Sequence, residues 1–345
     1  ARDMTITVEA GITMNVLAET LNTGGQRLPI DVPASERATL GGVIATNTSG
    51  PRRFGSGIIR DYVIGISAVD GRGVPFKGGG RVVKNVAGYD FCKLLTGSMG
   101  TLGLISQVTL KVRPIPQDAA FVVCPLNDWD QVRRLMMNLT TTKTTPSAVE
   151  ILQGPAWQED AALSAVNPGS LGRMAVAFEG TAVEVAWLVE QLESEWRDLG
   201  VTSLARVPID EIPGLWSRLT EFSAGDGASL VVKCTGLPSK TAGLIESLIA
   251  MDSTVDVQSH AGNGVVIARF GSSNDTAAWT QLIKERIQPA AATAGGYATV
   301  IGGNAAKGLP VDCVWGKGTA AWELMRSVKK QFDPKNILNR GRFVF

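Results

Sequence analysis

The stretch that decides the fold of this chain is TGSMGTLGLISQVTLK, residues 96–111. Gly97, Gly100 and Gly103 recur at intervals of three, a pattern related to the dinucleotide-binding fingerprint G-x-G-x-x-G. That fingerprint opens into a helix, because the helix N-terminus holds the pyrophosphate of the nucleotide. Here apolar and polar residues alternate from 104 to 112, and this period of two predicts a strand. The glycine-rich turn therefore feeds a strand, and a Rossmann loop is disfavoured.

Composition narrows the class of protein. The chain has 345 residues, 44% hydrophobic and 19% charged, so it can bury a large core and is expected to form two domains. Its net charge of +1 gives no electrostatic reason to propose a nucleic-acid partner. No apolar run approaches the roughly 20 residues that span a bilayer. The four cysteines show no C-x-x-C spacing, which disfavours iron–sulfur and thiolate metal sites and fits a reducing, cytosolic setting.

The two ends of the chain have clear local patterns. Residues 1–116 begin with a strand at 5–9 and a helix at 12–25, and they later contain a hairpin that turns at Asp70-Gly71. The last region carries a helix at 318–332, followed by DPKNILNRGRFVF.

The middle of the chain follows a different pattern. From 117 to about 310, strand-like segments alternate with amphipathic helices, which predicts an α+β layer of two split β-α-β units. Strands are expected at 121–125, 148–152, 174–180, 229–234 and 264–270, and helices at 127–140, 181–199, 238–251 and 275–288.

Two glycine-rich segments, ATLGGVIATNTSG (38–50) and GSMGTLG (97–103), are candidates for ligand binding. Glycine lets another group approach the backbone, so both segments are predicted to be loops whose N–H groups face an elongated polar ligand. Either segment alone is better explained as a tight turn in a β-rich domain. The pair, separated by a hairpin, favours a long ligand with a pyrophosphate and an adenine.

Three separated motifs carry a family resemblance. Residues 39–73 and 82–117 closely resemble the FAD-binding domain of the vanillyl-alcohol-oxidase (p-cresol methylhydroxylase) superfamily. The ending KKQFDPKNILNRGRF (329–343) is similar to that superfamily's C-terminal signature. Within the superfamily, KNVAGYD (84–90) and GPRR (50–53) resemble the FAD-binding subunits of bacterial glycolate oxidase.

The resemblance implies an α+β fold. It consists of a two-subdomain FAD-binding domain of p-cresol methylhydroxylase type at 1–116, an α+β, ferredoxin-like cap at 117–316, and a return to the FAD-binding domain at 317–345. In the superfamily the main pyrophosphate loop lies between the first two strands, which would place it before residue 1. The FAD-binding domain is therefore expected to be N-terminally incomplete, and the chain as it stands is expected to be largely free of flavin.

The resemblance also implies a set of cofactor contacts. FAD is expected to be held noncovalently, because no histidine or cysteine matches a family attachment site. The implied contacts from the two glycine-rich segments are Thr39, Gly41, Gly42, Thr46, Asn47, Ser49, Gly50, Gly97, Ser98, Gly100, Thr101 and Gly103. The backbone of Ile105 is expected near the adenine, and Asn339 near the flavin ring. The sequence departs from the family at Arg340, which replaces a proline, and at Met99, where many relatives carry glutamate.

A few ionisable and aromatic side chains outside the glycine-rich segments are further candidates for the site. His260 is the only histidine, so the family's histidine-rich metal cluster cannot form, and a surface or turn role is favoured. Arg52 and Arg53 could bind a phosphate or carboxylate, or form an exposed basic turn. Lys84 and Tyr89 could lie near the flavin, although a solvated Lys84 and a packed Tyr89 are favoured. No catalytic residue is assigned, and no metal is expected.

Two functions follow from the resemblance. In the first, the chain is an FAD-dependent oxidoreductase subunit of a glycolate (2-hydroxy acid) oxidase complex. In the second, it is a non-catalytic flavoprotein or structural subunit, which the lack of an evident general base favours. The implied partners are a larger FAD-containing glycolate oxidase subunit, an iron–sulfur subunit and a small 2-hydroxy acid. The implied location is the cytoplasm, with the complex able to lie against the inner membrane.

Overall fold

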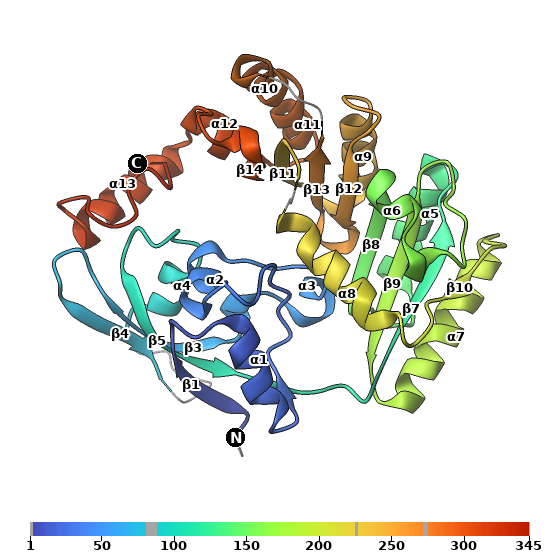
Figure 1. Cartoon of the computed structure of the whole chain (residues 1–345), viewed down its shortest axis with the longest axis horizontal. Coiled ribbons are helices and arrows are strands. Elements are labelled where there is room, and N and C mark those ends of the chain that lie inside the picture. Colours follow the sequence, from blue (N-terminus) through green and yellow to red (C-terminus); the bar gives the residue numbers. More distant parts are fainter. Residues whose placement is uncertain (1–2, 81–87, 225–226, 272–274, 345) are drawn as a thin grey trace. The chain divides into compact units, whose positions relative to one another are not determined.

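The computed structural model describes residues 3–80, 88–224, 227–271 and 275–344. The chain forms two compact units (Figure 1). Unit 1 comprises Ala1–Gly50, Ser56–Ile115 and Lys317–Phe345, and unit 2 comprises Pro51–Gly55 and Pro116–Gly316. Within the described ranges, no helix is long and apolar enough to cross a membrane.

Unit 1 is built on a four-stranded antiparallel sheet in the order β1-β5-β3-β4. The strands are β1 (Thr5–Glu9), β3 (Val63–Val69), β4 (Pro75–Gly79) and β5 (Leu104–Lys111). The predicted strands at 5–9 and 104–112 are confirmed, and so is the hairpin formed by β3 and β4. Asp70 closes the hairpin turn, because its carboxylate accepts the amides of Arg72 and Val74 at 2.8 and 2.9 Å.

The helices of unit 1 complete its core. The predicted helix at 12–25 is confirmed as α1 (Met14–Asn22), which buries Met14, Leu17 and Leu21 along one face. These side chains join a core that also contains residues of α2, α4 and the sheet. The other helices and short strands are α2 (Leu40–Thr46), α3 (Arg53–Ser56), α4 (Phe91–Leu95), α13 (Ala320–Phe332), β2 (Gln26–Arg27) and β6 (Arg113–Pro114).

Unit 2 contains an eight-stranded antiparallel sheet in the order β10-β7-β9-β8-β12-β13-β11-β14. Its strands are β7 (Asp118–Pro125), β8 (Ala148–Gln153), β9 (Arg173–Gly180), β10 (Ala205–Arg206), β11 (Leu230–Thr235), β12 (Asp256–His260), β13 (Val265–Phe270) and β14 (Ala298–Gly302). The first four strands have the order 4-1-3-2, the last four repeat that order in mirror sequence, and β8 and β12 join the halves. The two predicted β-α-β units are thereby confirmed.

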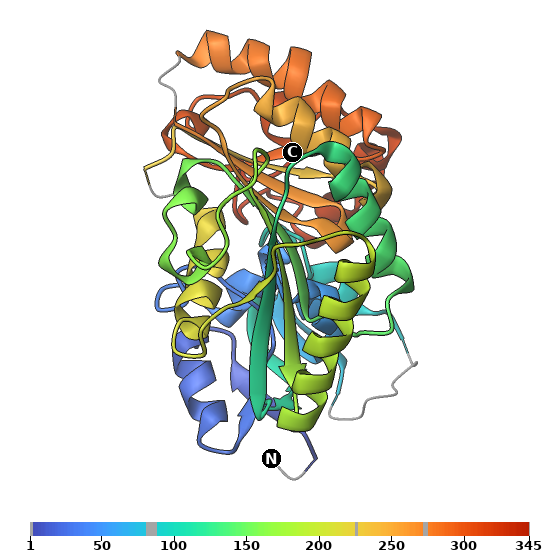
Figure 2. The ribbon, with the colours of Figure 1, turned by 90° about the vertical axis from the view of Figure 1, so that its right-hand side faces the viewer.

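Helices cover both faces of this sheet. Val122 and Cys124 of β7 pack with residues of α5, α7, α9 and α10, whereas Phe121 and Val123 pack with residues of α6 and α8 on the opposite face. Figure 2 shows α8 and α7 on opposite sides of the strands. The helices are α5 (Trp129–Thr141), α6 (Pro155–Gln158), α7 (Ala182–Asp198), α8 (Ile212–Glu221), α9 (Thr241–Ile249), α10 (Thr276–Leu282), α11 (Gln288–Thr293) and α12 (Val311–Trp315). The face that includes Phe121 carries the polar residues considered below.

Candidate functional site

The glycine-rich turn before β5 is a tightly folded loop held against the C-terminal end of α2. Gly97, Met99 and Gly100 all have left-handed backbone, with φ of 78°, 55° and 69°. The amides of Gly97 and Met99 donate to the carbonyls of Ile44 and Ala45 at 2.9 and 2.8 Å. These bonds fix the turn in a conformation that glycine adopts readily and methionine seldom adopts.

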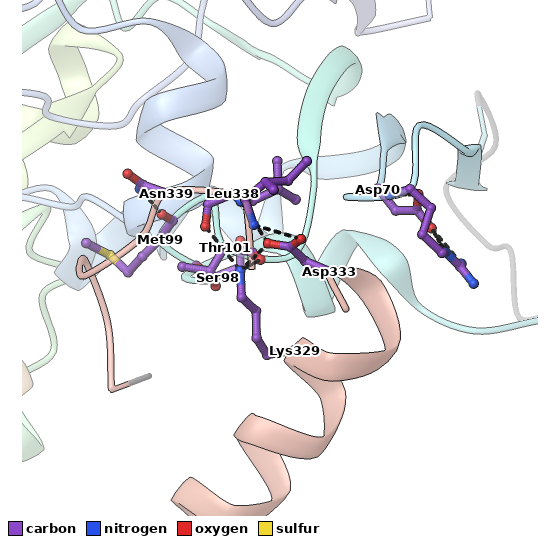
Figure 3. Close-up of polar contacts among 10 residues, drawn as sticks. Asp70, Ser98, Met99, Thr101, Lys329, Asp333, Leu338 and Asn339 are labelled. Atoms are coloured by element: carbon purple, nitrogen blue, oxygen red, sulfur yellow. Dashed lines mark hydrogen bonds and ion pairs between the residues drawn. The ribbon is translucent and has the colours of Figure 1, made fainter. Parts of the chain in front are cut away.

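Two side chains at this turn carry polar atoms without a partner. Asn47 Oδ1 and Ser98 Oγ are buried, and neither makes a hydrogen bond with the described part of the chain. The C-terminal tail adds Asn339, whose Nδ2 donates to the carbonyl of Met99 (Figure 3). Buried polar atoms are normally paired, so unpaired ones at this turn fit a polar ligand such as FAD. Five implied contacts thus come together: Asn47, Gly97, Ser98, Gly100 and Asn339.

The first glycine-rich segment is not the open loop that was predicted. Leu40–Thr46 forms α2, and the hydroxyl of Thr39 caps it by accepting the amide of Gly42 at 3.3 Å. The amide of Gly41 donates to the carbonyl of Ala10 at 2.8 Å, and a Cβ on Gly41 would lie only 3.1 Å from Ala10 Cβ. The paired glycines are therefore explained by helix capping and close packing, and those two amides are not free for a ligand.

Several other implied contacts pack or form hydrogen bonds within the protein itself. Thr101 is buried, and its hydroxyl donates to the carbonyl of Ser98 at 2.6 Å. Gly50 lies against Asp31, since an added Cβ would come 2.6 Å from Asp31 Cβ. Ile105 pairs with a strand residue of β3 inside the sheet. As flavin contacts, the five residues that come together at the turn stay predictions, and so do Thr39, Gly41, Gly42, Thr46, Ser49, Gly50, Thr101, Gly103 and Ile105.

The motif KNVAGYD lies mostly outside the described residues, and Lys84 is among those outside. Tyr89 is 86% exposed, so the prediction of a packed side chain is wrong. Its ring meets only that of Phe91 among the ring contacts of the described residues, with centroids 6.3 Å apart.

Unit 2 holds a buried polar cluster on β8 and β12. His260 is 3% exposed and Glu150 fully buried, and His260 Nδ1 lies 2.8 and 3.0 Å from the two carboxylate oxygens of Glu150. Nε2 of Gln258 donates to the same carboxylate at 2.8 Å. Of the surface or turn role predicted for His260, the surface part is therefore wrong, whereas the residue does lie directly before the turn at 261–263. A carboxylate facing Nδ1 favours the tautomer with its proton on Nδ1, and in that neutral tautomer Nε2 is the acceptor of the ring.

Lys233 lies on the same face of the sheet as this cluster. It alternates along β11 with Val232 and Cys234, which belong to the opposite core, and shares its face with Val231. No carboxylate pairs with Lys233 among the residues that the structure describes. Burial, and then the charge of Arg53, lower the pKa of this lysine. A cation placed this way lacks an anionic partner.

The segment 51–55 lies along unit 2 and places Arg53 there. Arg52 donates to both oxygens of Glu179 at 3.1 and 3.2 Å, and its guanidinium stacks 3.6 Å from the ring centroid of Trp216. Arg52 thus holds the segment 51–55 to the rest of unit 2. Neither interpretation from the sequence, a ligand-binding arginine or an exposed basic turn, describes it. A Cβ on Gly262 would come 2.2 Å from the ring of Phe54, so that ring seats on the turn after His260.

Sequence reasoning missed Glu150, Gln258 and Lys233. The available signal was a charged residue inside an apolar strand, as in AVEIL and SLVVKC, because a charge there must be paired or functional. Within the described ranges, no group of three or more His, Cys, Asp or Glu side chains could hold a metal ion.

Comparison with protein families gives two matches. Residues 1–78 match the family described as FAD binding domain, and residues 115–343 match the family described as FAD linked oxidases, C-terminal domain.

The chain is similar to individual proteins named as glycolate oxidase subunits and as D-lactate dehydrogenases. Glycolate oxidase subunit GlcE of Escherichia coli (strain K12) is 40% identical over 116 residues, which is 33% of this chain and 33% of that protein. Glycolate oxidase subunit GlcD of Bacillus subtilis (strain 168) is 24% identical over 99% of this chain and 75% of its own length. D-lactate dehydrogenase of Archaeoglobus fulgidus is 26% identical over 97% of this chain and 76% of its own length.

Among solved structures, alkyldihydroxyacetonephosphate synthase matches 98% of this chain and 65% of its own, with a TM-score of 0.65 and 19% identity. A second crystal structure of the same enzyme has a TM-score of 0.63 and 17% identity. The chain therefore spans about two thirds of these proteins. At this identity the likeness concerns the fold alone, and it confirms the predicted α+β architecture.

Proposed function

The chain belongs to the family of FAD-linked oxidases, its cofactor is FAD, and from that premise we propose that it oxidises a small 2-hydroxy acid with noncovalently bound FAD. The similar proteins named above support this substrate class, because glycolate and D-lactate are both 2-hydroxy acids. The match to GlcE covers only a third of that protein, so the activity of the whole protein is part of the proposal.

The residues of unit 1 that would hold the cofactor are those at the glycine-rich turn. Asn47 and Ser98 offer unpaired polar atoms, and Asn339 offers a side chain held beside the turn. When bound, FAD supplies the acceptor for the hydride that leaves the hydroxyl-bearing carbon.

The observation that carries the proposal is Lys233, a partly buried lysine with no carboxylate partner among the described residues. A 2-hydroxy acid brings a carboxylate, which would pair with Lys233 and Arg53 and oppose the lowering of the lysine pKa by burial. The same molecule carries its hydroxyl on the neighbouring carbon, so holding the carboxylate also orients the hydroxyl.

His260 would accept the hydroxyl proton. Glu150 holds Nδ1 and stabilises the imidazolium that forms when Nε2 takes up a proton, and Gln258 holds Glu150 in place. This pair would supply the general base that the sequence did not reveal, and it therefore supports a catalytic subunit over a non-catalytic one.

We further propose that the chain works as a subunit of a multi-subunit glycolate oxidase. Both GlcD and GlcE are named as subunits of such an enzyme. In this arrangement the electrons would leave through a larger FAD-containing subunit and an iron–sulfur subunit, and the complex would lie in the cytoplasm or against the inner membrane.

The test is anaerobic reduction of the full-length, FAD-loaded protein by glycolate, D-lactate and the non-hydroxylated acid acetate. We expect one of the two hydroxy acids to bleach the flavin absorbance band and acetate to leave it unchanged. Lys233→Met should raise the KM at least 100-fold, whereas His260→Gln should lower kcat and leave KM within about threefold. Lys240→Met, on an exposed lysine, is the matched control.

Two results would contradict the proposal. If neither hydroxy acid bleaches the flavin until a partner subunit is added, the chain relays electrons and is not itself the oxidase. If Lys233→Met leaves KM unchanged, the substrate carboxylate does not bind at this lysine.

A further inference from the structure

The end of α13 holds a buried ion pair that belongs to none of the sites considered above. Lys329 is 5% exposed and Asp333 is 2% exposed, and they lie one helical turn apart. Nζ of Lys329 lies 2.5 Å from Asp333 Oδ2, 2.9 Å from the carbonyl of Thr101 and 3.1 Å from the carbonyl of Leu338 (Figure 3). An ammonium has three N–H donors, and these three acceptors satisfy them all.

Asp333 also shapes the chain that follows α13. Its carboxylate accepts the amides of Ile337 at 3.0 Å and Leu338 at 2.7 Å, so the tail is folded back onto the end of the helix. The hairpin turn of unit 1 fits tightly against this point, because a Cβ on Gly71 would come 2.4 Å from Asp333 Oδ1. The amide of Gly71 donates to the carbonyl of Phe332 at 2.9 Å. The loop between α13 and Leu338 is thus fixed at its start, by the bond from Gly71 to Phe332, and at its end, by the bonds from Ile337 and Leu338 to Asp333.

These bonds connect the ion pair to the two elements that the proposed function assigns to the cofactor, the glycine-rich turn and the C-terminal tail. The carbonyl of Thr101 belongs to the glycine-rich turn, and Leu338 immediately precedes Asn339. Asn339 has left-handed backbone with φ of 42° and donates to the carbonyl of Met99. One ammonium therefore joins the turn that contains Ser98 to the tail that contains Asn339.

We propose that Lys329 and Asp333 are positioning residues for the flavin site, which act by holding Asn339 and the turn around Ser98 in one arrangement. The inference rests on the FAD site of the proposed function and is independent of the substrate. Because the ammonium bonds to the turn and to the tail at once, removing the ion pair releases both, whereas loss of a single contact would release only one.

The test is a double-mutant cycle on FAD affinity, measured by quenching of flavin fluorescence with the full-length protein. Asp333→Asn keeps the size and the acceptor oxygen of the side chain but removes its charge, and Asn339→Ala removes the group that the ion pair positions. We expect each change to weaken FAD binding 10- to 100-fold, and the double variant to be weakened by less than the product of the two single effects. Lys330→Met, on the exposed neighbour of Lys329, should change the affinity less than twofold.

A second measurement separates positioning from a general loss of stability. Hydrogen exchange of the flavin-free protein should show faster exchange at 97–101 and 337–340 in Asp333→Asn and Lys329→Met, with unit 2 unchanged. If the two losses of affinity multiply in the double variant, Asp333 does not act through Asn339 and the proposal is overturned. Unchanged exchange at the turn and the tail also overturns it. Failure of the proposed oxidation would be seen in flavin bleaching and not in either of these measurements.

Discussion

Each unit holds a lysine that is removed from water, Lys329 fully and Lys233 in part, and the surroundings of the two side chains differ. Lys329 in unit 1 meets a carboxylate and two carbonyls, so its own chain satisfies the charge completely. Lys233 in unit 2 has no carboxylate partner among the described residues, and its pKa is lowered by burial and then by Arg53. A buried charge that is fully paired stabilises one conformation, whereas an unpaired one is costly until a ligand supplies the counter-ion. The difference separates a structural ion pair from a candidate binding site.

The largest effect is expected from breaking the satisfied pair. Lys329→Met leaves the Asp333 carboxylate and the carbonyls of Thr101 and Leu338 without their donor. Loss of one partner of a buried ion pair typically costs about 3–5 kcal/mol, so we expect a decrease of this order in the free energy of unfolding. Urea denaturation measures it, and Lys330→Met should change it by less than about 0.5 kcal/mol. Equal losses of stability in Lys329→Met and Lys330→Met would show that the ion pair of Lys329 does not stabilise the fold.

A somewhat smaller effect is expected at the polar cluster of unit 2. Glu150→Ala leaves His260 and the amide of Gln258 without an acceptor in a fully buried position. Unsatisfied buried polar groups cost about 1–3 kcal/mol each, so the free energy of unfolding should fall by about 2–4 kcal/mol. Glu150→Gln, which keeps an acceptor oxygen, should lose less. Equal losses in the two variants would show that the shape of the side chain, and not its hydrogen bonding, is what matters.

The acid limb of stability tests the charge on Asp333. Burial alone would raise its pKa, but hydrogen bonds from Lys329 and from the amides of Ile337 and Leu338 outweigh burial, and the pKa is lowered. The contribution of this group is therefore fully present above the ordinary value of 3.8 and is lost as pH falls through the lowered pKa. We expect Asp333→Asn to have a shallower loss of stability in this acid range, which denaturation midpoints from pH 2 to 5 would measure. Parallel curves would contradict this assignment.

The smallest effect is expected at the unpaired lysine. Since the folded chain binds the proton of Lys233 less tightly than the unfolded chain, stability should rise with pH between the lowered pKa and 10.5. Lys233→Met should lack this rise and should change the stability at pH 7 by less than about 1 kcal/mol, because a partly buried cation without a counter-ion gains no pairing energy in the folded state. Burial raises the pKa of Cys124 and Cys234 to about 12, and these thiols make stability fall as pH rises. Their contribution is the same in the wild-type protein and in Lys233→Met, so it cancels in the comparison. A large destabilisation would show that Lys233 is paired.

Local patterns predicted much of the fold. The alternation after Gly103 predicted β5, the turn at Asp70 predicted the hairpin, and apolar strand-like runs alternating with helices predicted the halves of the large sheet. β12 escaped prediction because Asp256, Gln258, Ser259 and His260 give it no apolar pattern, although most of the strand is buried. Residues that satisfy one another across strands need not be apolar to lie inside a sheet.

The sequence by itself determined the class of protein: a glycine-rich turn feeding a strand, with a C-terminal motif to match, and a family of FAD-linked oxidases. Only the tertiary structure decided which side chains meet. Glu150 and His260 are 110 residues apart, and Lys329 and Thr101 are 228 residues apart. Their contacts follow from the β8–β12 register and from the return of the tail to unit 1. Local propensity acts over a few residues, whereas strand pairing and burial act between segments whose separation along the chain is arbitrary, so the charges that pair are known only once the chain is folded.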